Sequence, residues 1–158
     1  MISSARKYVY ITTPYLIPDS ETLSALKLAS KSGVDVRIIA PHIPDKWYVN
    51  AVTKANYSSL IQAGVKMYEY RYGFIHAKSI ISDDDYGVTG TVNFDFRSFH
   101  MLFENSIFIY KSKVLYQLKA DFINTLEECT EITDEFFQNK SFFQKIIYSV
   151  LRFFSAMM

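Results

Sequence analysis

The chain has 158 residues and a net charge of +1, and 49% of its residues are hydrophobic. This length and composition indicate one globular domain with a large core, and they exclude disorder as the main state. The near-neutral charge provides no broad basic field, so we expect no nucleic acid among its partners. Because Cys129 is the only cysteine, an intrachain disulfide and a cysteine-based zinc site are both excluded, which fits a reducing compartment.

Strands and helices are expected to alternate over the first half of the chain. The segment YVYITT alternates β-branched and aromatic residues and predicts a strand that is closed by Pro14. A helix should begin at a cap of Asp19 or Ser20 and end before Gly33. The expected strands are 8–13, 34–40 and 65–70, and the expected helices are about 20–32 and 47–63. Strands joined through helices of this length predict crossover connections and a largely parallel arrangement.

The pattern changes after residue 70, where strand-like segments follow each other with short connections. These segments are 77–82, 86–90 and 104–110, and DDDYG, residues 83–87, has the composition of a turn. A helix is expected from about 112 to 128. Because short connections reverse the chain direction, part of the sheet should be antiparallel. The expected fold class is α/β, a sandwich with a mixed, mostly parallel sheet flanked by helices.

Residues 134–158 are expected to form a C-terminal amphipathic helix, after a domain that spans residues 1–133. Apolar side chains recur there every four residues, at Phe142, Ile146, Val150 and Phe154. One interpretation is a helix packed on the domain or on a partner. The alternative is a helix lying in a membrane interface, since aromatic residues accompany Lys and Arg and no acid follows Glu135. The sequence has no uninterrupted run of about 18 apolar residues that would span a membrane.

The segment 73–94 combines several chemical groups at a fixed spacing, His76-x-Lys78-x4-Asp83-x6-Gly90-Thr91-x-Asn93. Since side chains alternate along a strand, His76 and Lys78 are expected to share one face at the start of a strand. An ammonium, a hydroxyl and an amide suit a phosphoryl group, and an imidazole suits nucleophilic attack or proton transfer. A His-x-Lys pair alone is typical of a loop histidine and a surface lysine. The complete spacing favours a phosphoryl site.

This spacing resembles the signature of the phospholipase D superfamily, HxK(x)4D(x)6G[ST]xN, in a single copy. The stretches ITTPYLIPD, AGVKMYEY, GFIHAKSIISDD and NFDFRSFHMLFEN resemble, more narrowly, the C-terminal catalytic half of bacterial cardiolipin synthases. The resemblance covers nearly the whole chain and implies a phospholipase D-like fold. Two positions depart from it, because Thr91 replaces the commoner serine and Leu102 stands where asparagine is frequent.

The resemblance implies a reaction without metal or other cofactor, through a phosphohistidine intermediate at a site made of two facing motifs. It favours His76 as the general acid/base, although the nucleophile role stays open. It assigns Lys78, Thr91 and Asn93 to phosphate binding. Glu104 matches a glutamate of the family that accepts the Nδ1 proton of the histidine.

The three consecutive aspartates receive different expectations. Asp83 belongs to the catalytic motif, where a structural or cross-site hydrogen-bonding role is expected rather than that of a base. Asp84 and Asp85 are expected to be solvated turn residues.

The function implied by the resemblance is transfer of a phosphatidyl group between two phosphatidylglycerol molecules, giving cardiolipin and glycerol. The partners would be the phospholipid, a membrane surface, and either an N-terminal half with a second motif or a homodimer mate. The opening MISSARK resembles the last turns of a helix, so we hypothesise that the chain was cut from a longer protein. The resemblance to the family implies that this protein acts at the cytoplasmic face of the bacterial cell membrane. The alternatives are a homodimeric nuclease or phosphodiesterase of the same superfamily, and a non-catalytic membrane-docking module.

Overall fold

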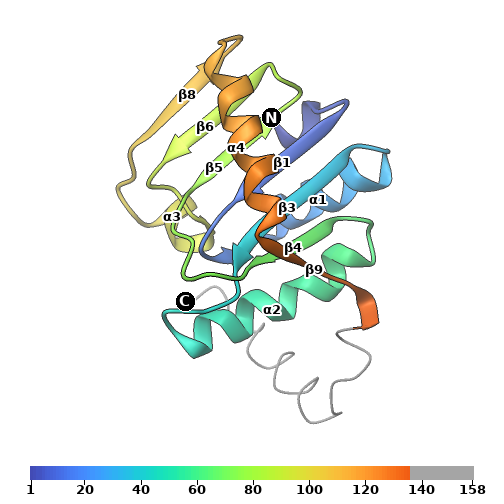
Figure 1. Cartoon of the computed structure of the whole chain (residues 1–158), viewed down its shortest axis with the longest axis vertical. Coiled ribbons are helices and arrows are strands. Elements are labelled where there is room, and N and C mark those ends of the chain that lie inside the picture. Colours follow the sequence, from blue (N-terminus) through green and yellow to red (C-terminus); the bar gives the residue numbers. More distant parts are fainter. Residues whose placement is uncertain (136–158) are drawn as a thin grey trace.

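The computed structural model describes residues 1–135, and the tail helix expected over 134–158 lies almost wholly outside these residues (Figure 1). The strands are β1 (Tyr8–Thr12), β2 (Leu16–Ile17), β3 (Asp35–Pro41), β4 (Lys66–Tyr70), β5 (Ser79–Ser82), β6 (Tyr86–Gly90), β7 (Phe94–Asp95), β8 (Ser106–Tyr110) and β9 (Cys129–Ile132). The helices are α1 (Ser20–Lys31), α2 (Trp47–Ile61), α3 (Phe96–His100) and α4 (Val114–Glu127), after a 3-10 turn at Ile2–Ser4.

The main sheet has seven strands in the order β8-β6-β5-β1-β3-β4-β9. Strand β1 pairs in parallel with β3, and β3 with β4, whereas the other neighbouring pairs are antiparallel. The expected mixed sheet is therefore confirmed, but the expectation that parallel pairs predominate is wrong. The short connection between β5 and β6 reverses the chain, and β9 returns antiparallel along β4, which the sequence pattern did not indicate.

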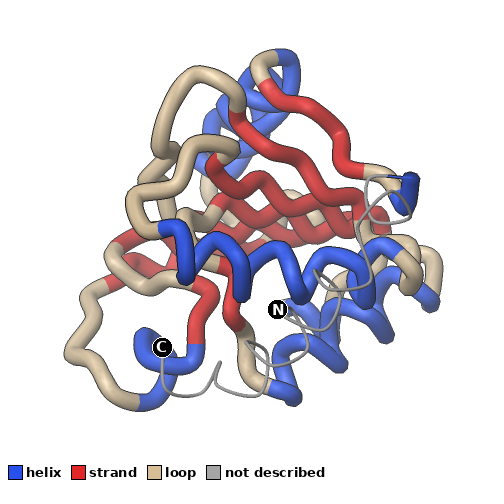
Figure 2. Tube along the Cα trace, turned by 90° about the horizontal axis from the view of Figure 1, so that it is seen from below, coloured by secondary structure: helices blue, strands red, loops and turns tan. Residues whose placement is uncertain are grey.

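Helices cover both faces of this sheet, as Figure 2 shows from the side. Alternate residues of β1 explain how the layers are held together. Val9 and Ile11 belong to the core cluster beneath α1 and α2, and Tyr8 and Tyr10 belong to the cluster beneath α4. Since burial of one large apolar side chain contributes about 1.5–3 kcal/mol, a central strand buried on both faces anchors both layers. The expected α/β sandwich is confirmed.

Local signals set the boundaries of the first helix as expected. The Asp19 carboxylate accepts a hydrogen bond from the Thr22 N–H at 2.7 Å and so caps α1. Gly33 follows the helix with φ of +91°, a conformation that glycine adopts without steric cost. The shorter elements α3, β2, β7 and β9 were not predicted, because two to five residues carry little periodicity.

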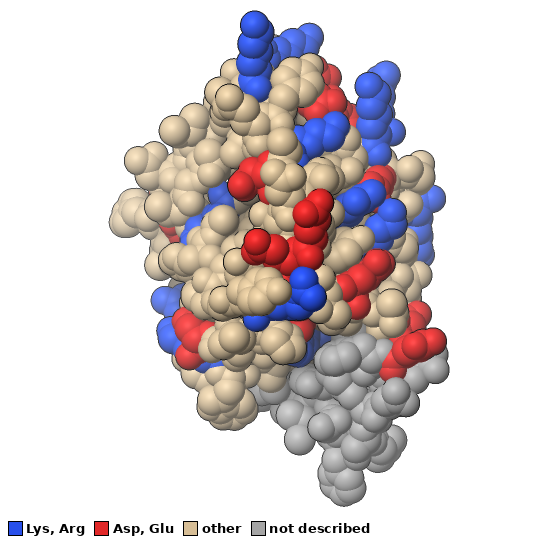
Figure 3. All heavy atoms as spheres, viewed as in Figure 1, with Lys and Arg blue, Asp and Glu red and all other residues tan. Residues whose placement is uncertain are grey.

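Charges of both signs are intermixed on the face that carries α4 (Figure 3). Within residues 1–135, none of the helices has the length and apolar character needed to cross a membrane.

Candidate active site

One edge of the main sheet collects the expected site residues from three separate segments. Strand β1 ends at Thr12, which lies opposite Ser79 at the start of β5. Ser79 in turn lies opposite Thr89, near the end of β6. Gly90 then pairs with Ser106 at the start of β8. This register brings the residues before β5, after β6 and before β8 to the same edge.

His76 and Lys78 lie in the irregular segment that leads into β5, rather than in a strand from residue 77 as expected. The Lys78 Nζ donates a hydrogen bond to the main-chain oxygen of His76 at 2.8 Å, which links the two residues. The His76 ring is exposed, and its centroid lies 5.5 Å from that of Phe74. An exposed imidazole beside a fixed ammonium leaves both groups accessible to a substrate.

Lys78 makes no ion pair with any residue in the described part of the chain. Burial lowers the pKa of Lys78 below its ordinary value, although the carboxylates of Glu104 and Asp95 act in the opposite direction. A half-buried ammonium that lacks a contacting anion favours the binding of one. A phosphoryl group would supply that charge.

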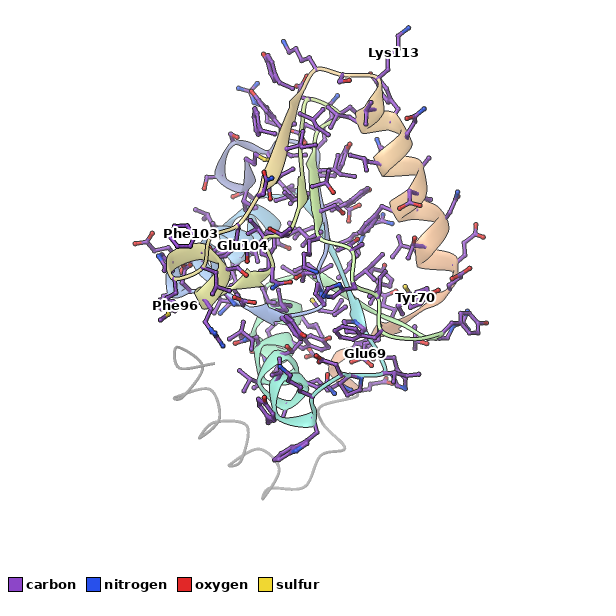
Figure 4. The ribbon with its side chains drawn as sticks, turned by 90° about the vertical axis from the view of Figure 1, so that its left-hand side faces the viewer. Glu69, Tyr70, Phe96, Phe103, Glu104 and Lys113 are labelled. Atoms are coloured by element: carbon purple, nitrogen blue, oxygen red, sulfur yellow. The ribbon has the colours of Figure 1, made fainter. Side chains whose placement is uncertain are left out.

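Thr91 and Glu104 form a second pair at this edge. The Thr91 hydroxyl donates a short hydrogen bond to the Glu104 carboxylate and accepts one from the Asn105 N–H at 2.9 Å. Figure 4 shows Glu104 in the connection between α3 and β8, away from Lys113 at the start of α4. Within residues 1–135, no hydrogen bond joins Glu104 to the His76 ring. The expected histidine–glutamate contact is therefore not formed, and the glutamate is held by Thr91 instead.

Gly90 allows this close approach between the end of β6 and the start of β8. A Cβ atom at Gly90 would lie 2.3 Å from the Asn105 oxygen and 2.6 Å from the Ser106 Cα. No side chain fits at these distances, so the glycine in the motif is required for backbone packing.

Asn93 is positioned by the short helix α3. Its Nδ2 donates to the Ser98 hydroxyl at 3.2 Å, and its Oδ1 is buried without a partner within residues 1–135. The Asp95 carboxylate accepts from the Ser98 N–H at 2.7 Å and so caps α3. Asn93 therefore keeps hydrogen-bonding capacity at the site edge.

Two pockets adjoin the expected phosphate-binding residues. One, of about 190 Å³, contains Lys78 and is walled mainly by apolar side chains, among them Val88, Phe94 and Phe99. The other, of about 170 Å³, is lined by Asn93 together with Tyr15, Lys46, Arg97 and the buried Asp95. The site edge thus opens to one apolar and one cationic pocket.

Asp83 does not join this edge. It follows β5, whereas His76 and Lys78 precede that strand, so the strand separates them. Its carboxylate accepts hydrogen bonds from the N–H groups of Arg6, Lys7 and Tyr8, at 2.7, 2.9 and 2.9 Å. The structural role anticipated for this member of the motif is thus supported, and no contact with the other motif residues is formed.

The electrostatics of this turn agree with that arrangement. Burial by itself would raise the pKa of Asp83, but the three N–H donors outweigh it and hold the pKa below the ordinary value. Asp84 is not the solvated residue that was expected. It accepts a hydrogen bond from the Tyr8 hydroxyl at 2.7 Å and pairs with the Lys119 Nζ at 3.0 Å.

Lys46, Arg97 and Tyr15 were missed as site residues at the sequence level. Strands β2 and β7 bring the segments of Tyr15 and Arg97 together, because Leu16 pairs with Phe94 and Ile17 with Asp95. Lys46 precedes α2, which is joined to β2 by a hydrogen bond from the Asn56 Nδ2 to the Leu16 oxygen. A two-residue ladder leaves no periodic signal. The other two histidines of the chain contact carboxylates: His42 contacts Glu69 and His100 contacts Asp19, each at 2.8 Å.

No cluster of three or more His, Cys, Asp or Glu side chains with the arrangement of a metal site occurs within residues 1–135.

The chain was compared with known protein families and with known proteins. Residues 1–126 match the family model "Cardiolipin synthase, PLD-like domain". A cardiolipin synthase from Halalkalibacterium halodurans is 44% identical over all 158 residues, which correspond to 31% of that protein. The chain thus spans about a third of the length of this curated relative.

Solved structures show the same fold. The phosphatidylserine synthase of Haemophilus influenzae Rd KW20 superposes with a TM-score of 0.75 at 17% identity, over 98% of this chain and 42% of that one. The phospholipase D family member Nuc from Salmonella typhimurium gives a TM-score of 0.73 at 22% identity, over 84% of this chain and 86% of that one.

Proposed function

The chain belongs to the cardiolipin synthase family of phospholipase D-like domains, and we propose that it supplies one half of a phosphatidyltransferase active site. The proposed reaction moves the phosphatidyl group of one phosphatidylglycerol to the terminal hydroxyl of another and releases glycerol. The observation that carries the proposal is the convergence of His76, Lys78 and Asn93 at one edge of the sheet. These groups supply a proton carrier, a cation and a neutral hydrogen-bonding group, which phosphoryl transfer requires.

The proposed chemistry has two displacements at phosphorus. In the first, the histidine of a second motif attacks phosphorus, the bond to the glycerol oxygen breaks, and His76 gives a proton to that oxygen. In the second, His76 takes the proton of the acceptor hydroxyl, whose oxygen attacks phosphorus and breaks the phosphorus–nitrogen bond. Lys78 and Asn93, with Thr91, hold the phosphoryl oxygens while charge develops on them.

Glu104 keeps a proposed role as the acceptor of the His76 Nδ1 proton in the assembled site. Its carboxylate is close enough to act on the pKa of Lys78, so it lies within the electrostatic reach of the site. In the described residues Thr91 holds it by a hydrogen bond. Formation of the complete site would then include a change of partner from Thr91 to His76.

The second motif and the setting of the enzyme are also part of the proposal. The curated relative is about three times longer than this chain, so another segment of the same protein can provide the second motif. The substrates are membrane phospholipids, and we place the site at the cytoplasmic face of the bacterial cell membrane.

A second candidate is a homodimeric phosphodiesterase, in which two copies of the single motif meet. The observation that favours it is the Nuc structure, since this chain covers 86% of that polypeptide. Diester hydrolysis by the 158-residue chain alone, with a rate that rises as the square of protein concentration, would support this candidate over the first.

The direct test uses the complete product of the gene that encodes this chain, with vesicles of phosphatidylglycerol. We expect cardiolipin and glycerol in equal amounts, and loss of both products in His76→Gln with an unchanged unfolding curve. Formation of phosphatidic acid without cardiolipin would contradict the transferase proposal, and vesicle binding without any turnover would favour a docking role.

A further inference from the structure

The cationic pocket beside Asn93 has a composition that the transfer site alone does not explain. It lies between the start of α2 and the first turn of α3, and six of the residues that line it are Tyr15, Lys46, Val49, Asn93, Asp95 and Arg97. Lys46 and Arg97 come from segments about fifty residues apart, and both are exposed. The pocket therefore presents two positive charges to solvent beside the reaction centre.

Neither of these two charges is neutralised by the described part of the protein. Lys46 and Arg97 make no ion pair or side-chain hydrogen bond within residues 1–135. Two acids of the same segments, Asp95 and Asp45, accept hydrogen bonds from other groups. Asp95 is buried and caps α3, and Asp45 accepts a hydrogen bond from the Tyr15 hydroxyl at 2.6 Å.

The start of α2 adds to the positive character of this pocket. Lys46 stands at the N-cap position and makes no side-chain capping bond, and Val49, in the first turn, lines the pocket. The N–H groups of a first helical turn have no partner within the helix, so they favour an anion nearby. Together with the two side chains, they fit a phosphate.

The proposed reaction involves a second phosphate, that of the acceptor lipid. Only one of the two phosphorus atoms reacts, while the acceptor phosphatidylglycerol carries its own phosphodiester, one glycerol unit from the attacking hydroxyl. Asn93 lines the cationic pocket and is also the proposed ligand of the reacting phosphoryl group. A phosphate in this pocket would therefore hold the acceptor next to the phosphorus that it attacks.

We propose that the pocket of Lys46 and Arg97 binds the phosphodiester of the acceptor lipid and thereby selects an anionic phospholipid over a neutral alcohol as acceptor. This inference rests on the proposed transferase function. The planar guanidinium of Arg97 can donate two parallel hydrogen bonds to a phosphate, and Lys46 contributes a point charge. Ile17 and Leu102, which also line the pocket, provide apolar surface for the glycerol backbone of the lipid.

An internal competition tests the proposal. The complete gene product receives phosphatidylglycerol vesicles with added ethanol, and cardiolipin and phosphatidylethanol are quantified from the same reaction. Both products arise from the same phosphatidyl-enzyme, so their ratio reports acceptor choice and does not depend on how much enzyme is folded. In Arg97→Gln we expect the ratio of cardiolipin to phosphatidylethanol to fall roughly tenfold, as for loss of a hydrogen bond to a charged group.

Two further variants sharpen the result. Lys46→Gln, at an exposed position, should lower the ratio in the same direction. Lys113→Gln removes a charge at the far end of the molecule (Figure 4) and should leave the ratio unchanged. An unaltered ratio in both Arg97→Gln and Lys46→Gln, or an equal fall in Lys113→Gln, would overturn the proposal. Absence of both products from the unaltered protein would instead count against the transferase function.

Discussion

The two ends of β5 carry two parts of one motif, and they differ in how many hydrogen-bond partners their polar side chains have. At the end of the strand, Asp83 receives three main-chain hydrogen bonds, all between 2.7 and 2.9 Å. At the beginning, the His76 ring is exposed, and within residues 1–135 the Lys78 ammonium forms a hydrogen bond only to a main-chain oxygen. Asn93, at the same edge of the sheet, has a buried oxygen without a partner in these residues.

Under the proposed function, this difference distinguishes residues that stabilise the fold from residues that bind the substrate. A carboxylate that accepts three main-chain N–H groups is held in the fold, and its removal leaves those donors unsatisfied. A cation without a contacting anion contributes little to the stability of the fold, but it can form an ion pair with a phosphate. The same motif therefore holds β5 in place at one end, and at the other end it supplies the proposed ligands of the phosphoryl group.

The largest expected effect is on catalysis at the beginning of the strand. His76→Gln should lower turnover by about 10²–10⁴-fold, the contribution of a placed acid or base, while the unfolding transition stays unchanged. His100→Gln is the matched control, because His100 is exposed and its partner Asp19 lies outside the motif. Rates from the complete gene product with phosphatidylglycerol measure both. Equal losses of turnover in the two variants would contradict a catalytic role of His76.

The next effect is on stability at the other end. Asp83→Ala removes the acceptor of three N–H groups, and we expect a loss of about 2 kcal/mol in the free energy of unfolding, allowing for partial exposure to water. Asp85→Ala, in the same turn, should change it by less than about 0.5 kcal/mol. Urea unfolding of the two variants provides the comparison, and equal stabilities would show that the three bonds contribute nothing.

A smaller effect is expected at Thr91, whose hydroxyl is one of the proposed ligands of the phosphoryl group. Thr91→Val keeps the shape but removes the hydroxyl, and turnover should fall by roughly tenfold, as for loss of one hydrogen bond to a charged group. Thr91→Ser retains the hydroxyl and should remain close to the unaltered rate. If valine and serine gave the same rate, the hydroxyl would have no role.

The smallest effect is the pH dependence of stability. Since the folded-state pKa of Asp83 is lowered, its contribution is complete above the unfolded value of about 3.9 and is lost as the pH falls through the folded value. Urea unfolding of the unaltered protein and of Asp83→Asn should therefore differ at pH 7 and converge in strong acid. A difference that grows on acidification would show that the folded-state pKa of Asp83 is not lowered.

Residues with local signals could be placed from the sequence. Asp19 and Gly33 mark the ends of α1, and the spacing from His76 to Asn93 predicted a group of residues of which His76, Lys78 and Asn93 lie at one edge of the sheet. The partner of Glu104 could not be read in this way, because it depends on how closely β6 and β8 approach at Gly90. The convergence of Lys46 and Arg97 on one pocket was also hidden, since it depends on packing between segments about fifty residues apart.

The most direct test compares the two ends of β5 by one quantity, the turnover per folded molecule. Folded protein is measured by the unfolding transition, and turnover by cardiolipin formed from phosphatidylglycerol, in His76→Gln and in Asp83→Asn of the complete gene product. We expect a stable but inactive His76→Gln, and an Asp83→Asn that is less stable but active in its folded fraction. A stable, inactive Asp83→Asn beside an active His76→Gln would contradict it.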